Sequence, residues 1–407
     1  MSMSKILVFS VLGSACVGTF ASPPAMAQED GFKMGNTTIK MGGFLKLDTI
    51  AVRTSDGDFV AEELRDMYIN GTTPVGGGSS ESSLTMHAKE SRFQFLTDTD
   101  VGTGVPLRGL IEMDFGPSRT MLNGTSTTNN ASVVLRHAYF QYGEWGFGQT
   151  WGTALFAPAV LETLNFFNLT EGMPSQRTPL IRYTKGPFTI SLERPTTTAQ
   201  LSGSDTSRAS LKKEFTSGVV PDLVARYSFQ AGRSQLAVVG ILRRLEVDGM
   251  VSNFGASAAP TLSESETGYG IGVAGNVPLG QATSLKFMAL GGSGVGRYTG
   301  LAFTPDVEVW DDGSKIEAVN HVGFNVGIAH SFNAQWRTNW GGGMEKADLH
   351  GRKLSERSWS GSANLLYSPT KPLTFGIELK HGVRELVNGD DGNQTRLQLS
   401  AVYKFGG

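Results

Sequence analysis

The stretch QTRLQLSAVYKF, residues 394–405, alternates apolar and polar side chains with a period of two. One parity holds Leu397, Leu399, Ala401, Tyr403 and Phe405, and the other holds Arg396, Gln398, Ser400 and Lys404. This alternation is typical of a strand that presents one face to lipid and the other to water. The pattern recurs from residue 36 onward, with turn residues between its repeats. The sequence therefore predicts an all-β fold, a transmembrane antiparallel β-barrel of the outer-membrane kind.

The start of the chain has the features of a cleavable signal peptide. Lys5 precedes an apolar run over residues 6–21, and an Ala-Met-Ala pattern follows at residues 25–27. Small residues at these spacings mark a signal-peptidase site. We therefore expect a signal peptide over residues 1–27 and a single barrel domain over residues 28–407.

The chain contains one cysteine, Cys16, which this cleavage would remove. The mature chain would then form no disulfide, so its stability would come from strand pairing and packing. A lipoprotein is the alternative, because Ala15 precedes Cys16, but Gly13 stands where a lipobox has a leucine-type residue.

The charge balance argues against a nucleic-acid partner. The chain has 35 basic and 37 acidic residues, and the signal peptide removes one lysine and no acid, so the mature net charge is 34 − 37 = −3. A nucleic-acid binder is normally basic. After the signal, no segment reaches the roughly 18 uninterrupted apolar residues of a spanning helix, so a membrane role would use strands.

Periodicity predicts sixteen strands, an even number as bacterial barrels require. They are expected near residues 36–53, 88–99, 106–115, 132–142, 145–151, 179–185, 187–195, 220–230, 233–246, 266–278, 282–297, 316–332, 334–346, 357–368, 372–385 and 394–405. Tight turns alternate with long segments along the chain. Short turns at one rim and long loops at the other are a barrel's asymmetry, for which a soluble β-sandwich or propeller gives no reason.

The loop over residues 152–178 is too apolar to remain in solvent, because it carries Phe156, Leu161, Phe166 and Phe167 among other apolar side chains. We expect it to fold into the lumen, with Pro158 opening a short helix there. Packing at a subunit contact is the alternative.

Three segments resemble the DcaP-like family of Gram-negative outer-membrane porins. They are LRHAYFQYGEWGFGQTW at residues 135–151, ESRFQFLTDTD at 90–100 and LETLNF at 161–166. The resemblance spans most of residues 36–405 and implies a sixteen-stranded homotrimeric barrel. It also implies a third extracellular loop folded inward and a lumen that passes small anions, dicarboxylates in the best-known members. Two departures stand out: no heptad-rich coiled coil precedes residue 36, and two glycines follow the terminal Phe405.

Strand parity assigns charged side chains to the lumen, because a charge facing lipid at mid-depth costs about 2 to 4 kcal/mol. The assigned bases are Lys40, Lys46, Arg92, Arg108, Arg182, Arg226, Lys286, Arg337, Lys380, Arg384, Arg396 and Lys404. The assigned acids are Asp48, Asp98, Glu112, Asp114, Glu193 and Glu378. A basic lumen concentrates anions and binds carboxylates through arginine.

The candidate constriction combines these charges with the inward loop. Arg92, Arg108 and Arg182 lie on strands next to the loop, which contributes Phe166 and Phe167. The acids expected opposite the arginines are Glu112, Asp114, Glu162 and Glu171. Alternatively, these charges only pair with one another to satisfy a polar lumen.

The strand over residues 132–142 has polar side chains in both parities, with Arg136 on one and His137 and Gln141 on the other. A strand at a subunit interface would permit this, and the face of Arg136 stays open. Trp145 and Trp151 fit either an interface or an aromatic girdle.

No cofactor or metal is expected, because the six histidines are scattered and none forms a pair at metal-ligand spacing on one element. A barrel enzyme would need a serine, a histidine and an acid near one rim, and no motif pairs His137 or His381 with such partners. We therefore expect no enzyme.

The predicted function is a passive outer-membrane diffusion channel for small anionic, dicarboxylate-like solutes. A non-selective general porin is the alternative. The expected surroundings are outer-membrane lipid and lipopolysaccharide, and a homotrimer follows only from the family resemblance.

Overall fold

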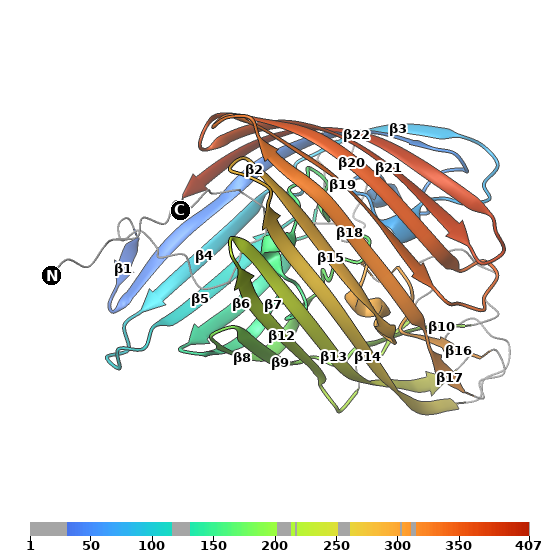
Figure 1. Ribbon diagram of the computed structural model, residues 1–407, viewed down its shortest axis with the longest axis horizontal. Helices are drawn as coiled ribbons and strands as arrows, with labels where there is room; N and C mark the ends of the chain where they lie inside the picture. The colour runs from blue at the N-terminus through green and yellow to red at the C-terminus, as the bar shows by residue number, and fades with distance from the viewer. Residues whose placement is uncertain are drawn as a thin grey trace.

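The structure, a computed structural model, describes residues 31–115, 131–201, 213–215, 218–250, 261–301, 303–310 and 315–406. The predicted signal peptide lies outside these residues. The described chain forms one large antiparallel sheet that closes on itself as a tilted barrel (Figure 1). Closure comes from β2 (Thr37–Thr54) and β22 (Asp391–Gly406), which pair from Gly42 opposite Gly406 to Thr54 opposite Gln394. The predicted barrel is confirmed.

Within the described residues the sheet contains 18 strands, which fill 16 wall positions. Two strands, β3 (Glu81–His87) and β4 (Arg92–Thr99), share one position, because both pair with β2. The short β1 (Phe32–Met34) only extends the wall beside the start of β2.

The remaining wall strands follow the predicted segments within a few residues, apart from longer ends on some of them. They are β5 (Leu107–Asp114), β6 (Val134–Tyr142), β7 (Trp145–Trp151), β8 (Arg177–Lys185), β9 (Phe188–Glu193), β12 (Asp222–Ala231), β13 (Ser234–Met250), β14 (Thr261–Pro278), β15 (Thr283–Ser293), β18 (Asn320–Ser331), β19 (Trp336–Ala347), β20 (Ser355–Thr370) and β21 (Leu373–Leu386).

Burial alternates along β22 as the sequence predicts. Leu397 and Leu399 are exposed on the outside, whereas Arg396 and Gln398 are 2% and 4% exposed on the inside. Outward apolar side chains suit lipid, and the inward charges avoid the cost of facing it. The barrel wall therefore separates an apolar exterior from a polar interior.

Short turns join alternate strand pairs. Gly143 between β6 and β7, Gly186 between β8 and β9 and Gly232 between β12 and β13 have φ values of 58°, 57° and 61°. Left-handed backbone of this kind favours glycine, because a Cβ crowds the neighbouring carbonyl oxygen there. The long connections fall at the opposite end of the barrel, since consecutive strands are antiparallel.

Three long connections turn into the barrel instead of leaving it. They are residues 55–80, 152–176 and the described parts of the third connection, 294–301 and 303–310. Their short 3-10 turns are η1 (Glu62–Arg65), η2 (Asn70–Thr72), η3 (Ala157–Ala159) and η6 (Gly296–Tyr298). Tyr68 and Tyr298 are fully buried at 0% exposure. The sequence predicted this path only for 152–178, where Pro158 does open the short turn η3.

A second, small sheet covers part of the long-loop end. Its strands are β10 (Thr197–Leu201), β11 (Lys213–Phe215), β16 (Val307–Val309) and β17 (Ile316–Ala318). β10 and β16 pair in parallel, and Val307 and Val309 pack on Leu245 and Val247 of β13. The sequence predicts the residues of β10, β11 and β16 as loops, whereas β17 is the start of the predicted strand 316–332, which the structure divides into β17 and the wall strand β18. The small sheet forms because β13 continues an apolar inner face beyond the wall, which needs a cover.

Candidate functional site

The inward segment, residues 152–176, and the wall line a chamber that is partly open to solvent, with about 870 Å³ of space between their atoms when that open solvent is included. Residues 162–168 form one side of it, and the wall strands supply the rest. Its charged lining side chains are Lys46, Glu90, Arg92, Arg136, Glu162, Arg177, Arg337 and Lys404. Six of these are bases and two are acids.

Leu164 fastens the inward segment to the wall. Its carbonyl oxygen accepts from Lys46 Nζ at 2.8 Å and from Gln398 Nε2 at 3.0 Å, while its N–H donates to Glu378 Oε2 at 2.7 Å. These partners stand on β2, β22 and β21, so three neighbouring strands hold one residue of the segment. The backbone that enters the lumen is thereby satisfied without regular secondary structure.

Close contact with glycine lets the segment also pack on β19, which only β20 separates from β21. A Cβ placed on Gly341 of β19 would lie 2.7 Å from Leu161 and 2.8 Å from Leu169. A side chain at this position would force the two leucine side chains to move, so the glycine makes room for them.

Four charges form a buried cluster beside the chamber. Arg92 lies 3.4 Å from Glu112 and 3.6 Å from Asp114, and Arg136 donates to both carboxylates, at 2.9 Å for Glu112. The guanidinium of Arg136 also lies 5.2 Å from the centre of the Phe166 ring. Glu112 and Asp114 are thus both paired with arginines in the structure.

A β-bulge explains the two polar parities of β6. Glu112 of β5 stands opposite His137, and Met113 stands opposite Leu135, so Arg136 is an extra residue in the ladder. Arg136 and His137 are consequently both buried, at 4% and 2% exposure. The interface explanation is not needed, because an extra residue changes strand parity locally.

Arg337 and Glu162 form the clearest ion pair across the chamber. Two guanidinium nitrogens of Arg337 donate to the two Glu162 oxygens at 2.8 and 2.7 Å. This fork geometry joins β19 to the inward segment. Phe166 and Phe167 line the chamber next to it, with ring centres 4.7 Å apart in an edge-to-face contact.

Three predicted arginines donate to oxygen atoms of the inward loops or of the strand end beside them. Arg182 donates to the Thr153 hydroxyl at 3.0 Å and to the Trp151 carbonyl, and Arg226 donates to the Thr153 carbonyl at 2.9 Å. Arg396 donates to the Arg65 carbonyl at 2.6 Å. They are interior residues as predicted, but they support loops and do not line the chamber.

Two residues predicted at the constriction, Arg108 and Glu171, do not line the chamber. Arg108 pairs with Asp98 at 3.2 Å, six register positions from the pair of Arg92 with Asp114, which is roughly 20 Å along the strand. Glu171 is 0% exposed and accepts from Tyr68 at 3.2 Å and from Ser360 at 2.8 Å. Strand parity shows which face of the wall a side chain is on, but not how far along the barrel axis it lies. Parity therefore could not show that Arg108 and Arg92 lie at different levels of the lumen.

Arg177, which was not predicted, lies at the first position of β8. Its guanidinium carbon is 3.7 Å from the centre of the Trp151 ring. The predicted strand begins at residue 179, so the sequence pattern places Arg177 in the preceding loop. Among the described residues, neither Arg177 nor the chamber residue Lys404 forms an ion pair with a carboxylate.

The comparisons with known proteins agree with this architecture. A family model described as the porin subfamily matches residues 34–400. The chain belongs to this porin subfamily.

Among solved structures, this porin is similar to the outer membrane channel DcaP of Acinetobacter baumannii. The identity is 23%, the TM-score is 0.72, and the match covers 92% of this chain and 99% of that chain. It is also similar to an anion-selective porin from Comamonas acidovorans, at 10% identity and a TM-score of 0.51 over 91% of this chain and 100% of that one. A third similar structure is OmpT of Vibrio cholerae in its trimer form. The identity is 10% and the TM-score is 0.51, and the match covers 91% of this chain and 99% of that chain.

No curated protein matches the sequence. The structural matches share the barrel fold, and together with the family they place the porin in the bacterial outer membrane. Among the residues that the structure describes, no helix is long and apolar enough to cross a membrane.

The porin's chamber contains two kinds of basic side chain. Lys46, Arg92, Arg136 and Arg337 have carboxylate partners. Arg177 and Lys404 line the same space without one among the described residues. A cation that lacks a carboxylate partner in a confined polar space attracts mobile anions. The chamber thus presents two cationic side chains that no carboxylate of the described residues neutralises.

Proposed function

We propose that this porin is a passive channel for small anionic solutes, dicarboxylates among them, and that the chamber is its selective section. The observation that carries the proposal is the position of Arg177 and Lys404 in the chamber wall without carboxylate partners among the described residues. Two separated cations suit a solute with two carboxylates, and neither has to break an ion pair to bind it. The porin in this proposal is not an enzyme.

The inward segment 152–176 forms the constriction in this proposal. Glu162, Phe166 and Phe167 border the chamber. Its fastening at Leu164 keeps the opening narrow and fixed. A solute then passes between a basic wall and the segment, under a field that orients charged or dipolar molecules.

The reversal potential of single channels in a potassium chloride gradient tests the selectivity. We expect an anion preference in the unmodified porin and a marked reduction in a variant with R177Q and K404Q. Arg244→Gln is the matched control, because Arg244 is an exposed arginine outside the chamber that pairs with Glu246 at 2.8 Å. A preference for cations, or a double variant with unchanged selectivity, would leave a non-selective general porin as the function.

The same chain would assemble as a homotrimer. Phe140 and Trp145 are 49% and 48% exposed on the outer face of β6 and β7. Phe140 stacks on Phe147 at 5.3 Å, and Trp145 contacts Tyr183 at 4.9 Å. This aromatic surface suits a subunit contact, and the molar mass of the detergent-solubilised porin by light scattering tests it.

A further inference from the structure

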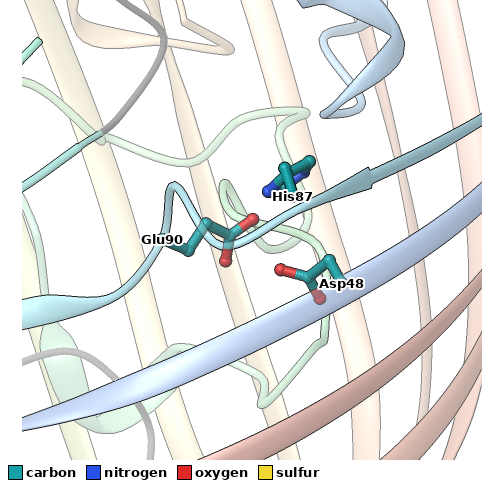
Figure 2. A group of neighbouring side chains, drawn as sticks. All are labelled: Asp48, His87 and Glu90. Atoms are coloured by element: carbon teal, nitrogen blue, oxygen red, sulfur yellow. The ribbon is translucent and has the colours of Figure 1, made fainter. Parts of the chain in front are cut away.

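Three buried side chains converge on the inner wall beside the chamber. They are Asp48 of β2, His87 at the end of β3, and Glu90 in the connection to β4 (Figure 2). One ligand atom from each lies within 4.8 Å of the other two. The residues are 0%, 4% and 7% exposed. Figure 2 shows the two carboxylates directed toward each other with the imidazole beside them.

An irregularity in the wall creates this convergence. Asp48 stands directly opposite His87, and Phe44 stands opposite Arg92. Four residues, 88–91, therefore face the three residues 45–47. The extra residue forms a tight turn in which the Ser91 N–H donates to the Ala88 carbonyl at 3.0 Å. Residues three apart on a regular strand point to opposite faces, but this turn brings His87 and Glu90 to the same side.

Several atoms of the group have unused binding capacity. Among the described residues, neither ring nitrogen of His87 has a hydrogen-bond partner of good geometry, although the Asp66 backbone lies beside the ring. Asp48 Oδ2 also lacks one, although Lys46 Nζ lies 3.2 Å from that oxygen. A buried polar group without a partner costs free energy, so each such atom calls for an explanation. A metal ion would satisfy them together.

The opposite side of Asp48 is already held in place. Its Oδ1 accepts from Gln398 Nε2 at 2.8 Å and from the Ser400 hydroxyl. Hydrogen bonds from residues behind a ligand are what orients carboxylates at metal centres. Oδ2 is thereby presented to the space between the three side chains.

We propose that Asp48, His87 and Glu90 bind a divalent transition-metal ion, with Zn²⁺ as the best fit. One imidazole nitrogen and two carboxylate oxygens match zinc, whereas calcium and magnesium take oxygen ligands in larger numbers. Three protein ligands leave a fourth position for water. Tetrahedral bonds of about 2.0 to 2.2 Å need ligand atoms roughly 3.5 Å apart, a small contraction of the group.

Lys46 is the built-in competitor of the ion. Its ammonium group donates to Glu90 and lies near Asp48 Oδ2, which are two of the oxygens that the metal needs. The same ammonium also donates to the Leu164 carbonyl at 2.8 Å, and Lys46 lines the chamber. Metal binding would release it from both carboxylates toward the chamber. The bound ion would then increase the anion preference, a consequence that rests on the proposed function.

Calorimetric titration of the full, metal-free, refolded porin in detergent with ZnCl₂ tests the site. We expect one ion per chain. The Zn²⁺ affinity of each of the variants His87→Gln and Glu90→Gln should be lower than that of the unmodified porin by about tenfold or more. Lys46→Met should bind more tightly, because it removes the competing charge. His381→Gln is the matched control, since the His381 ring pairs with the Thr395 hydroxyl at 2.8 Å, lies beside Trp359 and is not part of the three-residue group.

The visible spectrum of bound Co²⁺ gives a second readout that does not depend on conductance. A four-coordinate spectrum that disappears in His87→Gln supports the site. Two results would overturn the site. One is that the unmodified porin does not bind Zn²⁺. The other is that His87→Gln and Glu90→Gln, both folded as judged by native heat-resistant gel migration, bind Zn²⁺ as tightly as the unmodified porin does. Zn²⁺ binding is measured separately from the channel current. If the porin binds Zn²⁺ but its ion selectivity does not change, the result would count against the proposed function and not against the proposed metal site.

Discussion

The Arg177 guanidinium lies over the face of Trp151, with 3.7 Å between its central carbon and the centre of the ring. The two residues are cross-strand partners at the ends of β7 and β8 that adjoin the inward segment. A cation over an indole is attracted by the ring and keeps its charge. The contact therefore fixes the position of a chamber cation without neutralising it.

Replacing Trp151 with leucine should weaken dicarboxylate binding in the chamber. A cation–π contact contributes about 0.5 to 1 kcal/mol, so the half-blocking concentration of succinate should rise by about two- to fivefold. Single-channel current recorded with increasing succinate gives this value. Trp151→Phe keeps an aromatic face and should change it less; equal effects of the two variants would mean that the contact does not position Arg177.

Deleting residues 158–170 should raise the single-channel conductance. The deletion removes Leu164 and the aromatic pair from the chamber, while every wall strand and its ladder remain. Planar-bilayer recordings measure the change. Deleting residues 349–353, which join β19 to β20 and do not line the chamber, is the control, and a conductance equal in both variants would show that the segment does not constrict the pore.

Arg243→Met should destabilise the long-loop end of the barrel. Arg243 is fully buried, with Nε 3.0 Å from Asp222 and Nη1 2.7 Å from Asp306. Removing one partner of a buried ionic group leaves uncompensated charge and costs about 3 to 5 kcal/mol. Urea unfolding monitored by tryptophan fluorescence measures the loss.

The neighbouring Arg244 supplies the control for that experiment. It is exposed on the other face of β13, and its pairing with Glu246 is worth about 1 kcal/mol or less. Adding Asp222→Asn and Asp306→Asn to Arg243→Met should recover part of the loss. A triple variant as unstable as Arg243→Met would indicate lost packing as the cause.

His350 should make the attachment of the small sheet dependent on pH. The Glu308 carboxylate of β16 accepts from His350 Nδ1 at 2.8 Å and raises the pKa of the imidazole above its usual 6.5. A raised pKa means that the stabilisation is complete below about pH 6.5 and is lost as the pH rises through the folded pKa.

Amide exchange of residues 307–309 at pH 6 and at pH 9, corrected for intrinsic rates, should therefore show faster opening at the higher pH. The difference should be small, because the His350 side chain is 59% exposed. His350→Gln should abolish the difference. A variant that retains it would assign the effect to another group.

Strand number, strand positions and inner faces follow from the sequence because lipid imposes one rule on every strand. A charge on the outer face is costly, so parity alone locates Arg396 and Gln398 in the interior. Parity does not give the position of a side chain along the barrel axis. Arg92 and Arg108 have the same face, and only the register with Asp114 and Asp98 shows how far apart they lie.

The alternation of apolar and polar residues does not predict where strand pairing becomes irregular. The bulge at Arg136 and the extra residue in 88–91 each change the parity within a strand, and both occur beside functional candidates. The interior position of Tyr68 and Asn70 has no periodic signature, because irregular backbone is held there by individual hydrogen bonds. The small sheet depends on Ala199 meeting Val307, which the separation in sequence conceals.

The pairing of Gly42 with Gly406 has a consequence for biogenesis. The two residues belong to the first and last wall strands, so the ring cannot be sealed until almost the entire chain is present. A chain truncated before β22 would expose two open strand edges, whose amides have no water to bind in a bilayer. Closure of the ring thus waits for the last strand of the chain.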